Sequence, residues 1–597
     1  MKNDFRRTLL SVAFMMSLLM LWDHWNVFHG GRSMFAPRPP VVATTPKLPS
    51  TTTGAENAAM SATAASGAQS AGGSAAELQA QRFTIQTDVV KATLDTRGGD
   101  LIDLDLLKYQ QTYSHSEVLE AAKKLIGMTP APHPEGDVQV FDTAPDQFYA
   151  AQTGLADAKN GALPNQTTVM KLVSTERALA DGKNELALRF ESPDVGGVQL
   201  IKTYTFHRGS YAIDVTHEIV NHTNAPISPD LYLQLVRDGR VPAGGYFNGP
   251  SSYTGPSVYR DGTFHKISFS DIDKNKVKDT IDPKATTTNG WIAMIQHYFS
   301  SAWILPPDVS RSYSVGHFDT TVHGLPTYFA AMFTPVGTIA PGASQTVKAT
   351  LFAGPQEERL LEPLAPGLEQ VKDFGLLKII AQPLFWLLNK LHTLIGNWGW
   401  SIVALVVLLK VAFYGLNASA YRSMAKMKAV GPRVQELRTR YKDNPQQLQQ
   451  ETMKIYREEK VNPLGGCLPI FIQMPIFFAL FTVLTSSAEM RGAPWILWIK
   501  DLSVMDPYAI LPILMTCTSL LQIAMQPKPA DPTQAKMMWL MPLAFSVALF
   551  SFPAGLVLYW VTNNTLTILQ QWLINRQING PKPPKAADVS NAKIVKA

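Results

Sequence analysis

Five apolar runs follow one another in the last third of the chain, and they constrain its fold more than any other feature. Each is close to the length of about 20 residues that a helix needs to cross roughly 30 Å of hydrocarbon. Lipid offers no hydrogen bonds to a bare backbone, so we predict a polytopic α-helical membrane protein. The runs are Trp398 to Leu416, Cys467 to Leu484, Tyr508 to Met525, Met537 to Phe552 and Leu556 to Ile574.

A further apolar run, Thr8 to Trp22, follows a basic N-terminus and has the layout of a secretory signal. Bulky residues such as Trp25 and Phe28 stand where a small-x-small cleavage site would be expected. We therefore predict an uncleaved signal anchor, which brings the predicted spans to six.

Between the anchor and the apolar runs, the composition changes twice. A Pro-, Thr-, Ala-, Ser- and Gly-rich stretch is too poor in apolar residues to fold, so we predict a disordered linker. Short alternating runs such as Arg82-Phe-Thr-Ile-Gln-Thr and Val198-Gln-Leu-Ile-Lys-Thr-Tyr follow, separated by Gly, Asn, Asp and Pro. This pattern predicts a large antiparallel β-sandwich. Leu376 to Ile395 then mixes Lys and His with Leu, Ile, Phe and Trp, which predicts an amphipathic helix along the outer membrane face.

Basic residues set the predicted orientation, because Lys and Arg near span ends are retained in the cytoplasm. The segment between the second and third spans is dense in Lys and Arg, whereas the next loop has only Arg491 and Lys500, offset by Glu489 and Asp501. Both termini are therefore predicted inside and the β-sandwich outside. The predicted divisions are a signal anchor at 1–29, a linker at 30–77, a β-sandwich at 78–355, an amphipathic region at 356–397, a second span at 398–416, a helical hairpin at 417–462, the third to sixth spans at 463–576 and a basic tail at 577–597.

Lys410 stands within an apolar run, where an ammonium costs roughly 3 kcal/mol at mid-membrane. Counted from Trp398, it lies roughly 18 Å inward. A stem that snorkels to the inner headgroups and a hydrated, positively charged cavity are both open interpretations. No Asp or Glu in the runs accompanies it, which disfavours a buried ion pair. Candidate neighbours on other runs are Gln473, Thr516, Ser519, Gln522, Ser546, Thr562, Asn563, Asn564 and Thr565, with Tyr559 and Trp560 between them.

The basic segment after the second span reads as two helices joined at Asp443-Asn444-Pro445, because proline disfavours helix in the residue before it. Apolar stripes on both helices favour mutual packing over a dedicated binding face at Met424 and Met427, and the second possibility stays open. Its basic face can contact anionic lipid or ribosomal RNA, and charge does not choose between them.

Several other kinds of site are disfavoured. Cys467 and Cys517 lie in apolar runs, so we interpret both as packing residues rather than a disulfide. His217 and His222 are five residues apart in a β-like stretch, whereas a zinc-protease motif needs two His one helical turn apart. The sequence has no Gly-rich phosphate loop or nucleophile elbow, so we expect neither cofactor nor metal and no enzyme activity.

The stretch Val461-Asn-Pro-Leu-Gly-Gly-Cys-Leu-Pro-Ile-Phe-Ile-Gln-Met-Pro-Ile-Phe resembles the YidC family, which includes mitochondrial and chloroplast insertases. Ser423-Met-Ala-Lys-Met, Asp506-Pro-Tyr-Ala-Ile-Leu-Pro and Phe552-Pro-Ala-Gly-Leu-Val-Leu-Tyr-Trp add to the resemblance. It covers the whole chain and is strongest from about Gln382 to Ile574. It implies a bacterial inner-membrane protein with a periplasmic β domain and a five-helix insertase core.

The resemblance also implies a groove that opens to the cytoplasm and to lipid and is closed toward the periplasm. Its residues here would be Lys410, where Gram-negative members usually carry arginine, with Gln473, Tyr559 and Trp560. Two further polar or aromatic positions of the family groove are Val406 and Ser551 in this chain. The change from arginine to lysine keeps the charge and loses the planar fork.

By the same resemblance, the groove would hold the polar flank of a new membrane protein while its apolar segment enters lipid. The apolar path would include Ile470, Phe471, Met474 and Phe477. Hydrophobic partitioning would drive insertion without nucleotide. Expected partners are nascent membrane proteins, the Sec translocon, translating ribosomes and membrane lipids, with no specific nucleic acid beyond ribosomal RNA.

Two other functions compete with insertion. A small-solute transporter would show an inverted repeat with broken helices, and we see no such repeat. An enzyme or sugar-binding protein is the second, because the family's outer domain resembles galactose-mutarotase-like sandwiches; fold likeness alone is weak support for activity.

Overall fold

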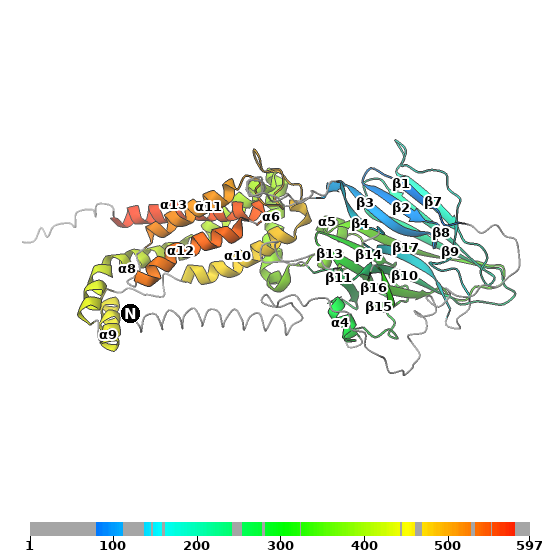
Figure 1. The fold of residues 1–597 in the computed structure, drawn as a ribbon, viewed down its shortest axis with the longest axis horizontal. Helices are drawn as coiled ribbons and strands as arrows, with labels where there is room; N and C mark the ends of the chain where they lie inside the picture. Colours follow the sequence, from blue (N-terminus) through cyan, green and yellow to red (C-terminus); the bar gives the residue numbers. More distant parts are fainter. Residues whose placement is uncertain are drawn as a thin grey trace, which may run out of the picture. The chain divides into compact units, whose positions relative to one another are not determined.

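In the computed structural model, the chain comprises a β domain followed by a helical part (Figure 1). The structure describes residues 79–111, 136–144, 147–157, 162–240, 253–277, 281–322, 324–441, 444–459, 468–526, 532–550 and 552–579. The predicted anchor at 1–29, the linker at 30–77 and nearly all of the basic tail lie outside these residues.

Two antiparallel sheets build the β domain, which confirms the antiparallel β prediction (Figure 1). The first sheet has the order β1 (Arg82–Gln86), β2 (Val90–Asp95), β3 (Asp100–Gln110), β5 (Tyr149–Ala156), β10 (Asp230–Asp238), β16 (Leu325–Pro335) and β15 (Ser312–Val322), with β4 (Asp137–Phe141) paired to β3. The second has the order β12 (Thr263–Lys266), β11 (Gly255–Arg260), β13 (Trp291–Gln296), β14 (Phe299–Ile304), β17 (Ser344–Pro355), β9 (Ala212–Asn221), β8 (Val198–His207), β7 (Glu185–Glu191) and β6 (Lys171–Leu172).

Alternation along the strands produces the shared core of the two sheets. On β7, for example, Leu186, Leu188 and Phe190 are buried, while the residues between them are exposed or half-buried. Because side chains alternate between the two faces of a strand, a period of two buries one face. Trp291 and Trp303 of the second sheet are among the largest fully buried side chains in this core.

A polar cluster lies buried inside this core. Lys202 on β8 and His217 on β9 are cross-strand neighbours. The Lys202 ammonium lies 2.7 Å from the carbonyl oxygen of Thr153 and 3.4 Å from Asp100 Oδ1. His217 Nε2 lies 3.0 Å from Thr153 Oγ1. His222, beyond the end of β9, is exposed and lies 3.0 Å from Asp194 through Nδ1, so the two histidines do not share a site.

Replacing His217 is expected to change how the stability of the β domain depends on pH. Burial, followed by the nearby Lys202 ammonium, lowers the pKa of His217 to about 3. Unfolding restores the usual pKa of about 6.5, so the unfolded chain binds more protons between these values and the His217 contribution falls with decreasing pH. From pH 7 to pH 5 it amounts to about 2 kcal/mol.

The measurement is pulse proteolysis in urea of the full chain in detergent, at both pH values, for wild type and His217→Gln. Asp100 acts in the opposite direction, because burial raises its pKa to about 7 despite the Lys202 ammonium. We therefore compare each variant with wild type: on acidification His217→Gln gains stability relative to wild type, whereas Val173→Ala, at an exposed position without a titratable side chain, does not. Equal pH dependence of wild type and His217→Gln would contradict this prediction.

The helical part begins after β17, with short elements leading into longer ones (Figure 1). The short α4 (Phe269–Asp273) belongs to the β domain. The other helices are α5 (Glu358–Leu361), η2 (Leu368–Val371), η3 (Gly375–Leu377), α6 (Lys378–Ile395), α7 (Trp398–Ala412), α8 (Tyr414–Arg440), α9 (Pro445–Glu458), α10 (Leu468–Ser486), η4 (Ala488–Met490), α11 (Ile510–Met525), α12 (Pro532–Leu549) and α13 (Ala554–Asn579).

Local sequence explains several boundaries. Gly396, in the left-handed region at φ 75°, ends α6, and the Asn397 side chain accepts from the Trp400 backbone N–H to begin α7. Among the described helices, none is by itself both long and apolar enough for a membrane span; Trp398–Ala412 and Tyr414–Met424, bent by 67°, reach that length and composition together. The six predicted spans therefore stay a prediction.

Helix α6 is apolar on two sides. Ala381, Leu384, Phe385 and Leu388 are buried against neighbouring helices. Its opposite side exposes Ile379, Trp386 and Leu394, the first at 89%. Apolar side chains left open in this way suit contact with lipid, as an amphipathic helix in the interface would provide.

After the bend, the chain continues as α8 and then α9, and residues 441–444 lie between these two helices. The Asn444 side chain accepts from the Gln447 backbone N–H, and Pro445 begins α9. Arg433 on α8 and Glu459 just after α9 form an ion pair at 2.5 Å. Met424 packs against Ala418, Tyr421 and Ile574 of α13, so this methionine contributes to packing at the base of α8.

The interpretation of Cys517 as a packing residue is wrong. Its side chain is exposed on α11, on the same side as exposed Ile513, Leu514 and Leu521. Helix α11 exposes some of its apolar side chains and buries others, so an apolar run does not tell which residues point inward. Cys467 lies outside the described residues.

Candidate substrate groove

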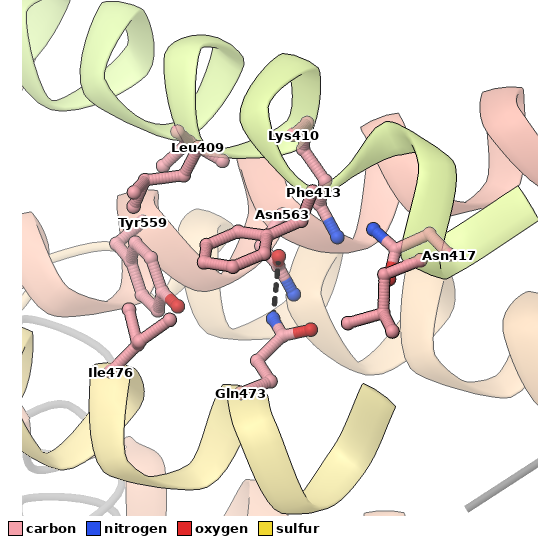
Figure 2. Close-up of a pocket in the computed structure, with 10 residues that line it drawn as sticks. Leu409, Lys410, Phe413, Asn417, Gln473, Ile476, Tyr559 and Asn563 are labelled. Atoms are coloured by element: carbon pink, nitrogen blue, oxygen red, sulfur yellow. Dashed lines mark hydrogen bonds between the residues drawn. The ribbon is translucent and has the colours of Figure 1, made fainter. Parts of the chain in front are cut away.

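A pocket lies among α7, the start of α8, α10 and α13 (Figure 2). Its volume of about 40 Å³ leaves room for roughly three water molecules. Both polar and apolar groups line it. The lining residues are Val406, Leu409, Lys410, Phe413, Leu416, Asn417, Gln473, Ile476, Tyr559 and Asn563.

Lys410 lies in the last turn of α7, just before the bend into α8. Its side chain is buried, with 8% of the residue exposed, and its Nζ donates to Thr567 Oγ1 of α13 at 2.8 Å. The Thr567 hydroxyl in turn donates to the Asn563 carbonyl at 2.7 Å. This position inside the helical part favours the cavity interpretation over snorkelling to the headgroups. Within the described residues, no carboxylate lies at ion-pair distance from the ammonium.

Gln473 and Asn563 connect the opposite walls of the pocket. Gln473 Nε2 on α10 donates to Asn563 Oδ1 on α13 at 2.8 Å (Figure 2). Tyr559, one helical turn before Asn563, also lines the pocket and is almost fully buried. Lys410, Gln473 and Tyr559, three of the four predicted groove residues, thus meet in one place.

Trp560, the fourth predicted groove residue, does not line the pocket. It packs edge-on against Phe477, with ring centroids 4.7 Å apart. Phe477 also faces Tyr559, so it is part of an aromatic cluster between α10 and α13. Met474, three residues before Phe477 on α10, is 47% exposed. Ile470 and Phe471 lie on α10, and their side chains are outside the described part of the structure.

Two polar neighbours of Lys410, Thr567 and Asn417, were not predicted from the sequence. Thr567 follows Asn563 by one helical turn and lies on the same face of α13, but this spacing does not say which residue of that face bonds to Lys410. Asn417 lies beyond the 67° bend, where the spacing of α7 no longer applies. Of the candidate neighbours, Thr516 bonds to Ser546 at 2.8 Å and Asn564 to Ser519 at 2.9 Å, joining neighbouring helices instead. Val406 lines the pocket, and Ser551 lies outside the described residues.

The pocket has apolar walls and five polar groups: the ammonium of Lys410, the phenol of Tyr559, and the side-chain amides of Asn417, Gln473 and Asn563. These groups donate and accept hydrogen bonds, and the lysine adds a positive charge. A polar segment placed here would exchange hydrogen bonds with water for bonds to the protein, which reduces its desolvation penalty.

Comparison with known proteins follows the same division of the chain. Residues 82–387 match the family described as the YidC periplasmic domain, and residues 390–582 match the 60Kd inner membrane protein family. A membrane protein insertase YidC of Ralstonia nicotianae is 47% identical over 98% of this chain and 100% of its own length. The chain belongs to the YidC family of membrane protein insertases. One from Burkholderia multivorans is 45% identical over 98% of this chain and 100% of its own length.

Membership of the YidC family implies a location in the inner membrane, with the β domain in the periplasm. A crystal structure of an active YidC insertase with its first transmembrane domain resolved is 16% identical, covers 82% of this chain and 91% of its own, and aligns with a TM-score of 0.36. The family assignment rests on the sequence relatives.

Proposed function

We propose that this YidC-family chain inserts new membrane proteins by holding their polar flanks in the pocket around Lys410. The single observation that carries the proposal is a buried ammonium, hydrogen-bonded to Thr567 within a pocket that also presents Gln473 and Asn563. A polar flank crossing bare hydrocarbon loses its hydrogen bonds, at several kcal/mol for each unsatisfied group. Temporary bonds in the pocket lower that barrier.

In this mechanism, the client's apolar segment leaves toward lipid along α10 and α12. The exposed side chain of Met474 on α10, and exposed Leu540 and Met541 on α12, offer a deformable apolar surface on that path. Ile470, Phe471 and Phe477 would extend it. Partition of the apolar segment into lipid drives the process, so the mechanism requires no nucleotide hydrolysis.

The proposal places six spans in the inner membrane, counting the anchor at 1–29, with both termini in the cytoplasm. The positive-inside bias supports this orientation, because α8 and α9 carry many Lys and Arg. Helix α6 then lies at the periplasmic interface with Ile379, Trp386 and Leu394 toward lipid. The basic hairpin of α8 and α9 contacts translating ribosomes and anionic lipid. The chain also acts as a chaperone beside the Sec translocon.

Co-translational insertion of a small client into liposomes that contain only this protein tests the proposal. Protease protection of the client's translocated segment is the readout. We expect protection well above that of empty liposomes, and a lower level when residues 422–460 are replaced by a short flexible linker. Protection equal to that of empty liposomes would contradict autonomous insertion and would favour action only with the Sec translocon.

A further inference from the structure

The short turn after α10 belongs to two hydrophobic cores at once. Ala488 of η4 is fully buried in the core of the β domain, whereas Met490, two residues later, is buried in the core of the helices. The outer end of α10 is therefore held between the two cores. Four polar side chains reinforce this position, and we call them the outer clamp: His297, Lys372, Glu489 and Arg491.

His297 and Arg491 connect the turn between β13 and β14 to the end of α10. His297 Nε2 lies 3.0 Å from the carbonyl oxygen of Thr485. The last carbonyls of a helix have no partner within it, so this contact satisfies one that would otherwise lack a bond. The Arg491 guanidinium lies 5.4 Å from the ring centroid of Phe299, and its Nη2 donates to the Gln110 carbonyl at 2.8 Å.

Lys372 and Glu489 connect the same turn to α6. Lys372 Nζ lies 2.9 Å from each carboxylate oxygen of Glu489. The lysine side chain is fully buried, and that of Glu489 is 14% exposed. The ammonium also lies 3.5 Å from the ring centroid of Phe385 on α6. A buried charge that loses its partner is strongly unfavourable, so this pair fixes its surroundings firmly.

We infer that the outer clamp sets the position of α10 and, through it, the width of the pocket around Lys410. Helix α10 carries Gln473 and Ile476, which form the pocket wall opposite Lys410. Gln473 lies about 18 Å from Thr485 along the helix axis, so a tilt at the outer end displaces the wall. The four clamp residues are positioning residues. Only the link to substrate rests on the proposed function; the position of α10 does not.

Chemical crosslinking across the pocket tests this inference. The full-length chain carries Gln473→Cys and Asn563→Cys, whose native side chains are in contact at 2.8 Å, in a background with Cys467→Ser and Cys517→Ser. A short bis-maleimide is added to membranes without any client, and the rate of crosslinking is measured. The variants are Glu489→Gln, Lys372→Met and their combination. The matched control is Lys183→Gln, which breaks the exposed ion pair with Glu176 in the β domain.

We expect each single clamp variant to slow crosslinking by about threefold or more, the range of coupling between linked sites. The double variant is expected to be no slower than the worse single variant, because both changes break one pair. Lys183→Gln is expected to match the background. Should the single variants lose protease resistance of the β domain, Arg491→Gln carries the same expectation, because it breaks a separate contact of the clamp.

Crosslinking rates of folded clamp variants equal to that of Lys183→Gln would overturn the inference. Because no client is present, this result is independent of insertion. A wild-type chain that fails to insert clients into liposomes would contradict the proposed function and leave the clamp measurement valid. Clamp variants with unchanged crosslinking in a chain that inserts clients would contradict the clamp alone.

Discussion

Lys410→Ala is expected to lower insertion about tenfold for a client whose translocated flank is acidic, which corresponds to about 1.4 kcal/mol of lost stabilisation. The ammonium is buried beside Thr567 in a pocket of amides, where a charge acts more strongly than in water. Alanine removes the charge and the stem together. The measurement is protease protection of the client in liposomes, at matched amounts of inserted protein.

Three further substitutions separate charge from shape. Lys410→Met keeps an unbranched apolar stem and is expected to lose nearly as much activity as alanine. Lys410→Arg keeps the charge and is expected to retain most of it, since arginine also donates to a hydroxyl. Thr567→Val removes the ammonium's partner while keeping the charge, so its effect is expected to be smaller than that of Lys410→Ala.

A client with a neutral flank supplies the readout that a merely structural role would not change. If Lys410 acts through its charge, Lys410→Met affects the acidic client much more than the neutral one. Equal losses for both clients would assign Lys410 to packing of the helices. If Lys410→Ala inserts the acidic client as well as wild type does, the charge of Lys410 does not contribute to insertion.

The β domain was predictable in kind because its sheets bury one face. Alternation in stretches such as 82–86 and 198–206 corresponds to β1 and β8. The order of the strands was not predictable, because β10 pairs with β5 and β16, partners far from it in sequence. The buried Lys202 was also missed: a lysine in an alternating run looks like a surface residue until its cross-strand neighbours are known.

The pocket around Lys410 was predictable in part. An ammonium in an apolar helix indicates polar neighbours on other helices, and the family resemblance implied Gln473 and Tyr559 among them. Both line the same pocket as Lys410. Which polar residue bonds to Lys410 depends on how α7 and α13 are rotated relative to each other, and the sequence does not contain that angle. For this reason Thr567 was missed, and Asn564, which faces α11, was included among the candidates.

Trp303 joins the two sheets of the β domain. It lies on β14 of the second sheet, is fully buried, and donates through its indole N–H to the Gln234 carbonyl of β10 in the first sheet at 3.2 Å. The side chain therefore fills the shared core and also satisfies a buried carbonyl on the opposite side.

Trp303→Ala is expected to destabilise the β domain by about 3–5 kcal/mol, because the cavity and the lost hydrogen bond act together. Trp303→Phe keeps most of the apolar contact and is expected to lose less. Pulse proteolysis of the full chain in urea measures both, and Val173→Ala, at an exposed position, serves as a control within about 0.5 kcal/mol of wild type. A Trp303→Ala chain as resistant as Val173→Ala would mean that the sheets are held together without this contact, and that the core relaxes to fill the space.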